Sequence, residues 1–140
     1  MEWPDTSGWK ASDTTNSGPV TLMRFFKGSE TLKNWTEQAE ITINKGTTNV
    51  PVEEGMKNVM SEVVSTCPQA QLTMLEKNEE DEFAWVQFVI ECPGKSTVYQ
   101  LVQGNINQYI VSVTMKTNSI DDDTRTAWKE LLTRGKVEYK

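Results

Sequence analysis

The chain has 140 residues, of which 14 are basic and 20 acidic, so its formal net charge at pH 7 is −6. An acidic surface opposes binding to nucleic acid and to anionic membranes, and no basic stretch offsets it, so we expect no nucleic-acid partner. Histidine is absent, which removes Ser-His-Asp and Cys-His nucleophile systems and histidine-ligated metals, and we expect no metal and no cofactor.

The length predicts one domain with a core of its own. Residues 1–8 are punctuated by proline, glycine and serine and form an expected loose lead-in, and residues 9–140 form the domain. No run approaches the roughly 18 apolar residues that a membrane-spanning helix needs. We therefore expect no membrane span.

The first third of the domain predicts strands at 9–14, 20–27 and 37–44. Asn16-Ser17-Gly18-Pro19 is a turn-rich connection between the first two. The third alternates, with Ala39, Ile41 and Ile43 on one face and polar residues on the other, which is typical of a half-buried strand. Residues 31–35 predict a short turn or a single helical turn before it.

Residues 50–66 change to a helical period. Their apolar residues fall on one face of a helix: Val52, Met56, Val59, Met60 and Val63. Asn49 is the expected N-cap, Pro51 suits the first turn, and Pro68 ends the helix. At this spacing the methionines favour core packing over an adaptable binding groove.

Four further strands are predicted, at 70–76, 83–91, 97–103 and 108–116. The strand at 83–91 is apolar on both faces, which favours a central position in the sheet. A last helix is expected to open at Ser119 or Asp121, with Trp128, Leu131 and Leu132 as its apolar stripe.

Helices that are segregated from the strands indicate an α+β domain. We expect a mostly antiparallel sheet of six to seven strands with two main helices. Both faces of an apolar central strand need cover, so the helices are expected on opposite faces.

Cys67 and Cys92 flank one predicted hairpin. Pairing its apolar faces sets Met74 opposite Val86 and places Cys92 opposite Pro68, one step from Cys67. A disulfide would close a loop of about 26 residues and contribute roughly 3.5 kcal/mol in the chain-entropy model. The alternative is two buried thiols in a cytosolic protein.

A disulfide would place the protein in the periplasm or outside the cell. Residues 1–4 lack the basic region and apolar run of a signal peptide. We therefore expect an exported protein whose signal peptide has been removed, with a cytosolic protein as the alternative.

Three motifs imitate functional sites. Gly94–Thr97 resembles the end of a phosphate-binding loop, but position 89 is valine where the first glycine belongs. Glu79–Glu82 lacks the alternating ligands of a calcium loop and is interpreted as a solvated hairpin tip. Asp121–Asp123 complements the positive end of the last helix.

The segment Phe26–Glu37 (FKGSETLKNWTE) resembles a junction in small secreted bacterial proteins of uncharacterised function. There a strand ends at Gly-x-Glu-Thr and resumes after Asn-Trp-Thr. The order of predicted elements is also similar to the PsbP/Mog1-like fold. This resemblance implies a binding or assembly role without a catalytic centre, and it carries over no site residues.

The leading hypothesis is therefore a non-enzymatic exported bacterial protein that binds another macromolecule, as an accessory, chaperone, inhibitor or immunity factor. A protein partner is expected, and the interface candidates are Trp9, Phe25 and Trp35. The alternative is a small-molecule or lipid carrier with a pocket between the sheet and a helix. An enzyme that works without histidine comes third.

Overall fold

A computed structural model describes residues 9–27, 37–48, 50–80 and 83–134. The predicted lead-in at 1–8, the turn at 31–35 and the cap Asn49 lie outside these ranges. In chain order the elements are β1 (Trp9–Ser17), β2 (Val20–Lys27), β3 (Glu37–Lys45), α1 (Val52–Thr66), β4 (Gln71–Asn78), β5 (Trp85–Cys92), β6 (Lys95–Gln103), β7 (Asn107–Met115) and α2 (Asp122–Arg134).

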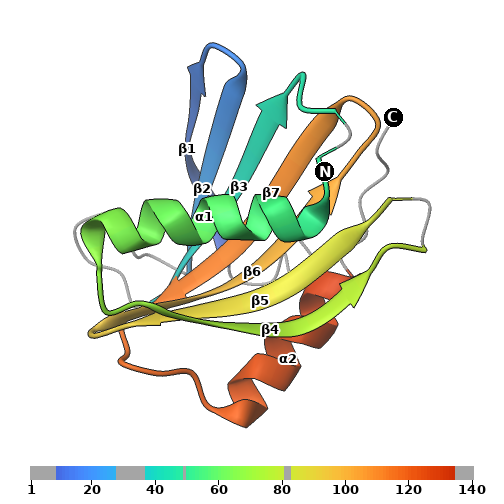
Figure 1. Cartoon of the computed structure of the whole chain (residues 1–140). Coiled ribbons are helices and arrows are strands. Elements are labelled where there is room, and N and C mark those ends of the chain that lie inside the picture. Colours follow the sequence, from blue (N-terminus) through green and yellow to red (C-terminus); the bar gives the residue numbers. More distant parts are fainter. Residues whose placement is uncertain (1–8, 28–36, 49, 81–82, 135–140) are drawn as a thin grey trace.

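The strands form one antiparallel sheet of seven, in the order β1-β2-β3-β7-β6-β5-β4 (Figure 1). The predicted α+β class is confirmed. The sheet joins a β1-β2-β3 meander to a β4-β5-β6-β7 meander through the pairing of β3 with β7. No helix among the described residues is long and apolar enough to cross a membrane.

The prediction that residues 83–91 form the central strand is wrong. β7 lies in the middle of the sheet, and β5 lies next to the edge strand β4. Apolar residues on both faces require only that both faces be covered. They do not require the middle position. Val86, Phe88 and Val89 are fully buried although β5 lies beside an edge strand, so both faces of β5 are covered there.

The predicted register of the β4–β5 hairpin is also wrong, by two residues. Met74 lies opposite Phe88 and Leu72 lies opposite Ile90. Because side chains alternate along a strand, a slip of two residues keeps every apolar side chain on its face, so the hydrophobic pattern alone could not distinguish the two registers. Cys92 is thus not opposite Pro68, and the Ala70 N–H donates to the Cys67 carbonyl to close a turn (3.0 Å).

A β-bulge between Met74 and Glu76 changes which face the end of β4 presents. Leu75 packs against the core cluster that contains Trp128, and Glu76 forms an ion pair with Lys129 of α2 (3.3 Å). The next residue, Lys77, lies opposite Val86 and forms an ion pair with Glu53 of α1. Without the extra residue, alternation would have turned Lys77 away from α1.

The first core cluster joins α1 to the sheet. Val52 and Met56 are buried against the even-numbered residues of β5 and Leu101 of β6. Val59, Met60 and Val63 are half-buried against the same cluster, as the helical spacing predicts. α1 begins at Val52 and Pro51, predicted in the first turn, occupies the N-cap position, so the prediction that Asn49 is the N-cap is wrong.

Gly55 allows α1 to approach the sheet closely. A Cβ added at Gly55 would lie 2.8 Å from Cδ1 of Leu101 and 2.9 Å from Nε2 of Gln108. Any larger residue would force these side chains to move, so glycine sets the depth at which the helix sits.

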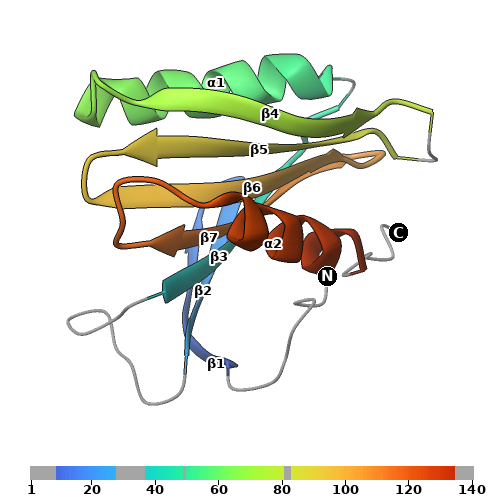
Figure 2. The same cartoon turned by 90° about the horizontal axis from the view of Figure 1, so that it is seen from below.

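The second core cluster surrounds Trp128 and Ile120. Trp128 belongs to α2, which lies beside β6 (Figure 2). The strand members of the cluster are mostly odd-numbered, with Val89 from β5 and Val111 and Val113 from β7 among them. Asp121 caps α2, because its carboxylate accepts the Thr124 N–H (2.7 Å), and this hydrogen bond lowers the pKa of the Asp121 carboxyl. The side chains of Leu131 and Leu132 lie outside the described part of the structure.

Candidate functional site

Both helices are attached at the C-terminal end of β5, through two adjacent residues. Cys92 forms a disulfide with Cys67, the residue that follows α1, and the Cα atoms of the pair are 6.6 Å apart. The predicted disulfide is therefore confirmed in the structure. Glu91, one residue earlier, binds the segment that opens α2.

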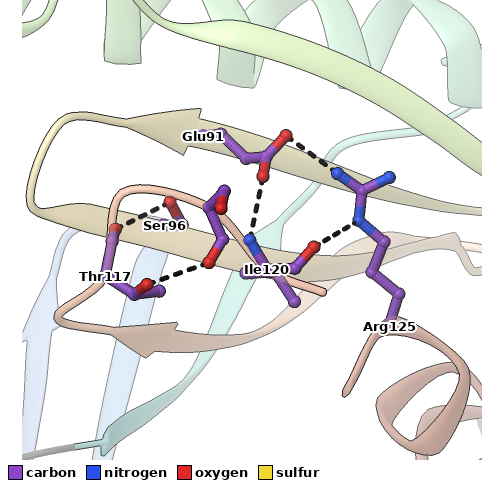
Figure 3. Close-up of polar contacts among 6 residues, drawn as sticks. Glu91, Ser96, Thr117, Ile120 and Arg125 are labelled. Carbon is purple, nitrogen blue, oxygen red and sulfur yellow. Dashed lines mark hydrogen bonds and ion pairs between the residues drawn. The ribbon is translucent and has the colours of Figure 1, made fainter. Parts of the chain in front are cut away.

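Glu91 is a structural anchor that sequence reasoning missed. One carboxylate oxygen accepts the Ile120 N–H (2.9 Å) and the other accepts from the Arg125 guanidinium (2.8 Å; Figure 3). Arg125 Nε also donates to the Ile120 carbonyl (2.9 Å). The side chains of Glu91 and Arg125 are only 17% and 21% exposed. Both oxygens of this carboxylate are thus engaged in holding α2.

The chain between β7 and α2 is held by a second set of polar contacts. Ser96 Oγ donates to the Thr117 carbonyl (3.0 Å), and Thr117 Oγ1 donates to the Ser119 carbonyl (2.9 Å; Figure 3). Asn118 Oδ1 accepts the Gly94 N–H (2.7 Å), which ties the segment to the β5–β6 turn. These contacts fix one wall of a surface groove.

The groove has a volume of about 360 Å³ and lies between the start of β4, the end of β5 and this segment. Its lining residues are four neutral polar residues, one carboxylate, the disulfide-bonded Cys92 and a proline: Gln69, Gln71, Glu91, Cys92, Pro93, Asn118 and Ser119. Amides and hydroxyls bind polar groups through hydrogen bonds. Within the described ranges, no group of three or more Cys, Asp or Glu side chains could hold a metal ion.

Among the described strands, β4 pairs only with β5 and is an edge strand of the sheet. The direction in which β4 points its backbone N–H and C=O groups follows from a hydrogen bond of the neighbouring strand pair. There the Gln103 N–H of β6 donates to the carbonyl of Ala84, the residue before β5 (3.0 Å). Hydrogen-bonded pairs alternate along an antiparallel ladder. Since Ala84 bonds to β6, the even-numbered residues of β5 also bond to β6, and the odd-numbered ones bond to β4.

It follows that Thr73, which lies opposite Val89, directs its backbone groups to β5. Leu72 and Met74 direct their N–H and C=O groups away from β5, to the open edge. An open edge of this kind is a template for an additional strand.

Apolar side chains line the same edge on the α1 side. Glu53, Met60 and Val64 fall on one face of α1, because residues 7 and 11 positions apart align on a helix of about 3.6 residues per turn. That face points to β4, because Glu53 forms an ion pair with Lys77. On β4, Leu72 and Met74 lie on the α1 side. We call Met60, Val64, Leu72 and Met74 the α1–β4 strip.

The α1–β4 strip is partly exposed. Val64 is 38% exposed and Met74 is 48% exposed, and they are two of the three large apolar side chains that are exposed in the described part of the chain. The third, Ile106, lies in the β6–β7 turn. Met60 and Leu72 are half-buried and pack against the core cluster that joins α1 to the sheet.

Charges surround one end of the strip. The Glu53–Lys77 contact lowers the pKa of the Glu53 carboxyl and raises the pKa of the Lys77 amine, in each case chiefly through their hydrogen bond. Lys77 also lies 3.9 Å from Glu79. Beyond it the sequence continues Glu79-Glu80-Asp81-Glu82, and Glu79 and Glu80 are exposed. This end of β4 is therefore acidic.

Of the three predicted interface residues, only Phe25 has a described side chain. Phe25 is half-buried against the core cluster around Trp128. Trp35 and the side chain of Trp9 lie outside the described residues, and the interface role of all three stays a prediction. Val64 was missed because it lies off the apolar stripe of α1, and Met74 because pairing it with a core residue implied burial.

No model of a known protein family matches the chain, and no curated protein sequence is significantly similar to it. Function is therefore inferred from the geometry of the described residues.

Proposed function

We propose that this chain is an exported, non-enzymatic protein that binds another protein along the edge of β4. The observation that carries the proposal is the coincidence of an open strand edge with exposed apolar side chains. Proteins protect long exposed edges, and apolar groups gathered beside one are typical of interaction sites. Met74 belongs to the open edge itself, and Val64 lies on the same face of α1 as Glu53, which contacts Lys77 of β4.

The disulfide supports export. Disulfides persist in oxidising compartments and are rare in the cytosol, where thiols are kept reduced. Cys67 and Cys92 are the only cysteines in the chain, and they are bonded to each other. The periplasm or the cell exterior is therefore the compartment that suits this pair.

We also infer that α1 and α2 cover opposite faces of the sheet. α1 packs on even-numbered residues of β5, such as Val86 and Phe88, whereas Trp128 of α2 belongs to the cluster that contains Val89. Successive side chains of a strand point to opposite faces. Strands held from both sides would present β4 as a rigid edge, which lowers the entropic cost of binding.

The carrier hypothesis receives less support from the same residues. Close packing at Gly55 leaves no space between α1 and β6 at that point. The groove of about 360 Å³ is open to solvent and lies at the strand ends, not between the sheet and a helix. Apolar ligands are usually held in enclosed apolar pockets.

Photo-cross-linking tests the proposal. A photoreactive amino acid is placed at position 74 and, as a matched control, at position 15, because Thr15 is exposed on the other edge strand, β1. Both proteins are irradiated in an extract of the extracytoplasmic fraction of the native host. We expect a protein adduct from position 74 that is absent from position 15. Adducts of equal yield at both positions, or none at position 74, would contradict the proposal.

A further inference from the structure

We infer that the partner contributes an extended segment that pairs with β4 as an eighth strand. Its apolar side chains lie at alternate positions against the α1–β4 strip, and basic residues lie at the end beside Glu79 and Glu80. The inference rests on the proposed function and specifies how the partner is recognised. The partner is thus an extended peptide segment that carries apolar and basic side chains.

The backbone of β4 supplies the first requirement. Leu72 and Met74 direct their N–H and C=O groups outward and are two residues apart. This spacing is about 7 Å along a strand and matches alternate residues of an added strand. The bulge between Met74 and Glu76 ends the regular edge, so the ladder extends over Gln71–Met74.

The side chains beside this edge differ on its two sides. On the α1 side, Val64 and Met74 are exposed and apolar. On the other side, Gln71 and Thr73 are exposed and polar, and Gln71 lines the groove. Because an added strand also alternates, every second side chain would meet apolar surface and the others would meet amides and hydroxyls.

Charge decides between a basic segment and a second copy of this chain. The acidic run Glu79–Glu82 follows the end of β4, and the nearby Lys77 already contacts Glu53 and Glu79. Basic residues on the partner would complement this end. In a second copy, parallel pairing of two β4 strands would bring the acidic runs together. Antiparallel pairing would place each run toward the start of the other copy's β4, where residues 63–75 carry no charge, so neither arrangement offers complementary charge.

The probe is a synthetic peptide of about eight residues, within the usual length of a strand, with valine and threonine alternating and two lysines at one end. One matched peptide replaces both lysines by glutamate. Another keeps the lysines but carries N-methyl groups on the amides of one edge, which removes the donors of that edge. The fourth peptide keeps the lysines and carries its N-methyl groups on the amides of the opposite edge. Each is titrated into the full-length, disulfide-bonded chain, with fluorescence anisotropy for affinity and amide NMR for the site.

We expect the lysine peptide to bind about tenfold or more tightly than the glutamate peptide. N-methylation of one edge should abolish binding, and N-methylation of the other should leave it intact, because only one edge faces β4. The amides of Leu72 and Met74 should become protected from hydrogen exchange on binding. Met74→Pro should weaken binding about tenfold or more, and Met74→Ala, which keeps the N–H, should weaken it less.

Several results would overturn the inference. Equal binding of both N-methylated peptides would exclude strand addition. Tighter binding of the glutamate peptide would exclude a basic partner segment. Failure of every peptide to bind would exclude both. If position 74 nevertheless cross-links to a protein, the proposed function stands and only the mode of recognition is wrong. If the chain sediments as a dimer that Met74→Pro dissociates, the edge is an interface between two copies. The N-methylated peptides need no variant, so the test survives if Met74→Pro fails to fold.

Discussion

The two helices are attached to the same end of β5 by different chemistry. α1 is held covalently, through Cys92, and α2 is held by hydrogen bonds and an ion pair to Glu91. A disulfide acts chiefly by limiting the freedom of the unfolded chain, so it holds at any pH and salt concentration that preserves the bond. A shielded ion pair depends on both partners, and removal of one leaves the other without compensation. The helix that borders the proposed binding edge is the one with the covalent link.

The disulfide provides the largest expected effect. Cys67→Ser combined with Cys92→Ser should lower the free energy of unfolding by about 3 kcal/mol, because the loop between them is no longer closed in the unfolded chain. The measurement is chemical denaturation of the double variant and of the oxidised native chain. Hydrogen exchange should show faster opening of α1 than of α2.

The wild-type chain under reductant is the matched control, since it lacks the bond but keeps both sulfur atoms. It should lose as much stability as the double variant. A loss below about 1 kcal/mol in both would mean that the covalent link does not distinguish the two helices.

Glu91→Ala tests the ionic attachment. We expect a loss of about 2 kcal/mol, because Arg125 and the Ile120 N–H both lose their acceptor in a shielded site. Glu91→Gln keeps one acceptor oxygen and should lose less. Chemical denaturation at neutral pH measures both variants. Equal losses would show that the charge on Glu91 contributes nothing to holding α2.

Tyr99 reports on the α1 side through pH. Its ring stacks on Phe88 (centroids 4.8 Å apart), and burial raises the pKa of the Tyr99 hydroxyl to about 12 from 10.0. The folded state therefore keeps its proton where the unfolded chain loses it. The protonated Tyr99 hydroxyl contributes fully to the free energy of unfolding below pH 10. This contribution is lost as pH rises toward 12, which lowers the free energy of unfolding by about 2 kcal/mol.

Denaturation of the native chain and of Tyr99→Phe between pH 9 and pH 12 measures this contribution. The variant should lose less stability over this range than the native chain. Identical slopes for the two proteins would contradict the burial of this hydroxyl under α1.

The Lys77–Glu53 pair should give the smallest effect. It lies at the solvent-exposed end of α1, where exposed ion pairs contribute little. Because the pKa of Glu53 is lowered, its contribution to stability is present at pH values above the ordinary carboxyl pKa and is lost as pH falls. The raised pKa of Lys77 means that its contribution is lost only in strongly alkaline solution.

Lys77→Met keeps the length of the side chain and removes its charge. Thermal denaturation should show a shift that is far smaller than that of Glu91→Ala and that disappears in high salt. A shift as large as that of Glu91→Ala would mean that α1 depends on this ion pair as well as on the disulfide.

Local pattern predicted most of the elements, because alternation in residues 37–44 and helical spacing in residues 50–66 follow directly from which side chains are buried. The disulfide was predictable because Cys67 and Cys92 flank one hairpin. The two-residue slip of Met74 and the bulge after it were not, because pattern fixes the face of a strand and leaves its register open.

The open edge depends on tertiary neighbours that local pattern does not specify. Leu72 and Met74 have the same alternation whether β4 lies inside the sheet or at its edge. Val64 joins Met74 at the surface only because α1 runs beside that edge. Glu91 binds Arg125 across 34 residues of sequence, a separation that no local signal spans.

Backbone hydrogen exchange of the full chain alone tests most directly the claim that β4 presents a free edge. Leu72, Thr73 and Met74 are adjacent in one strand, but only the Thr73 N–H points to β5. We predict fast exchange at Leu72 and Met74 and slow exchange at Thr73 between them. Exchange at Leu72 and Met74 as slow as at Thr73 would show that the edge is already covered, and the proposed binding site would not exist.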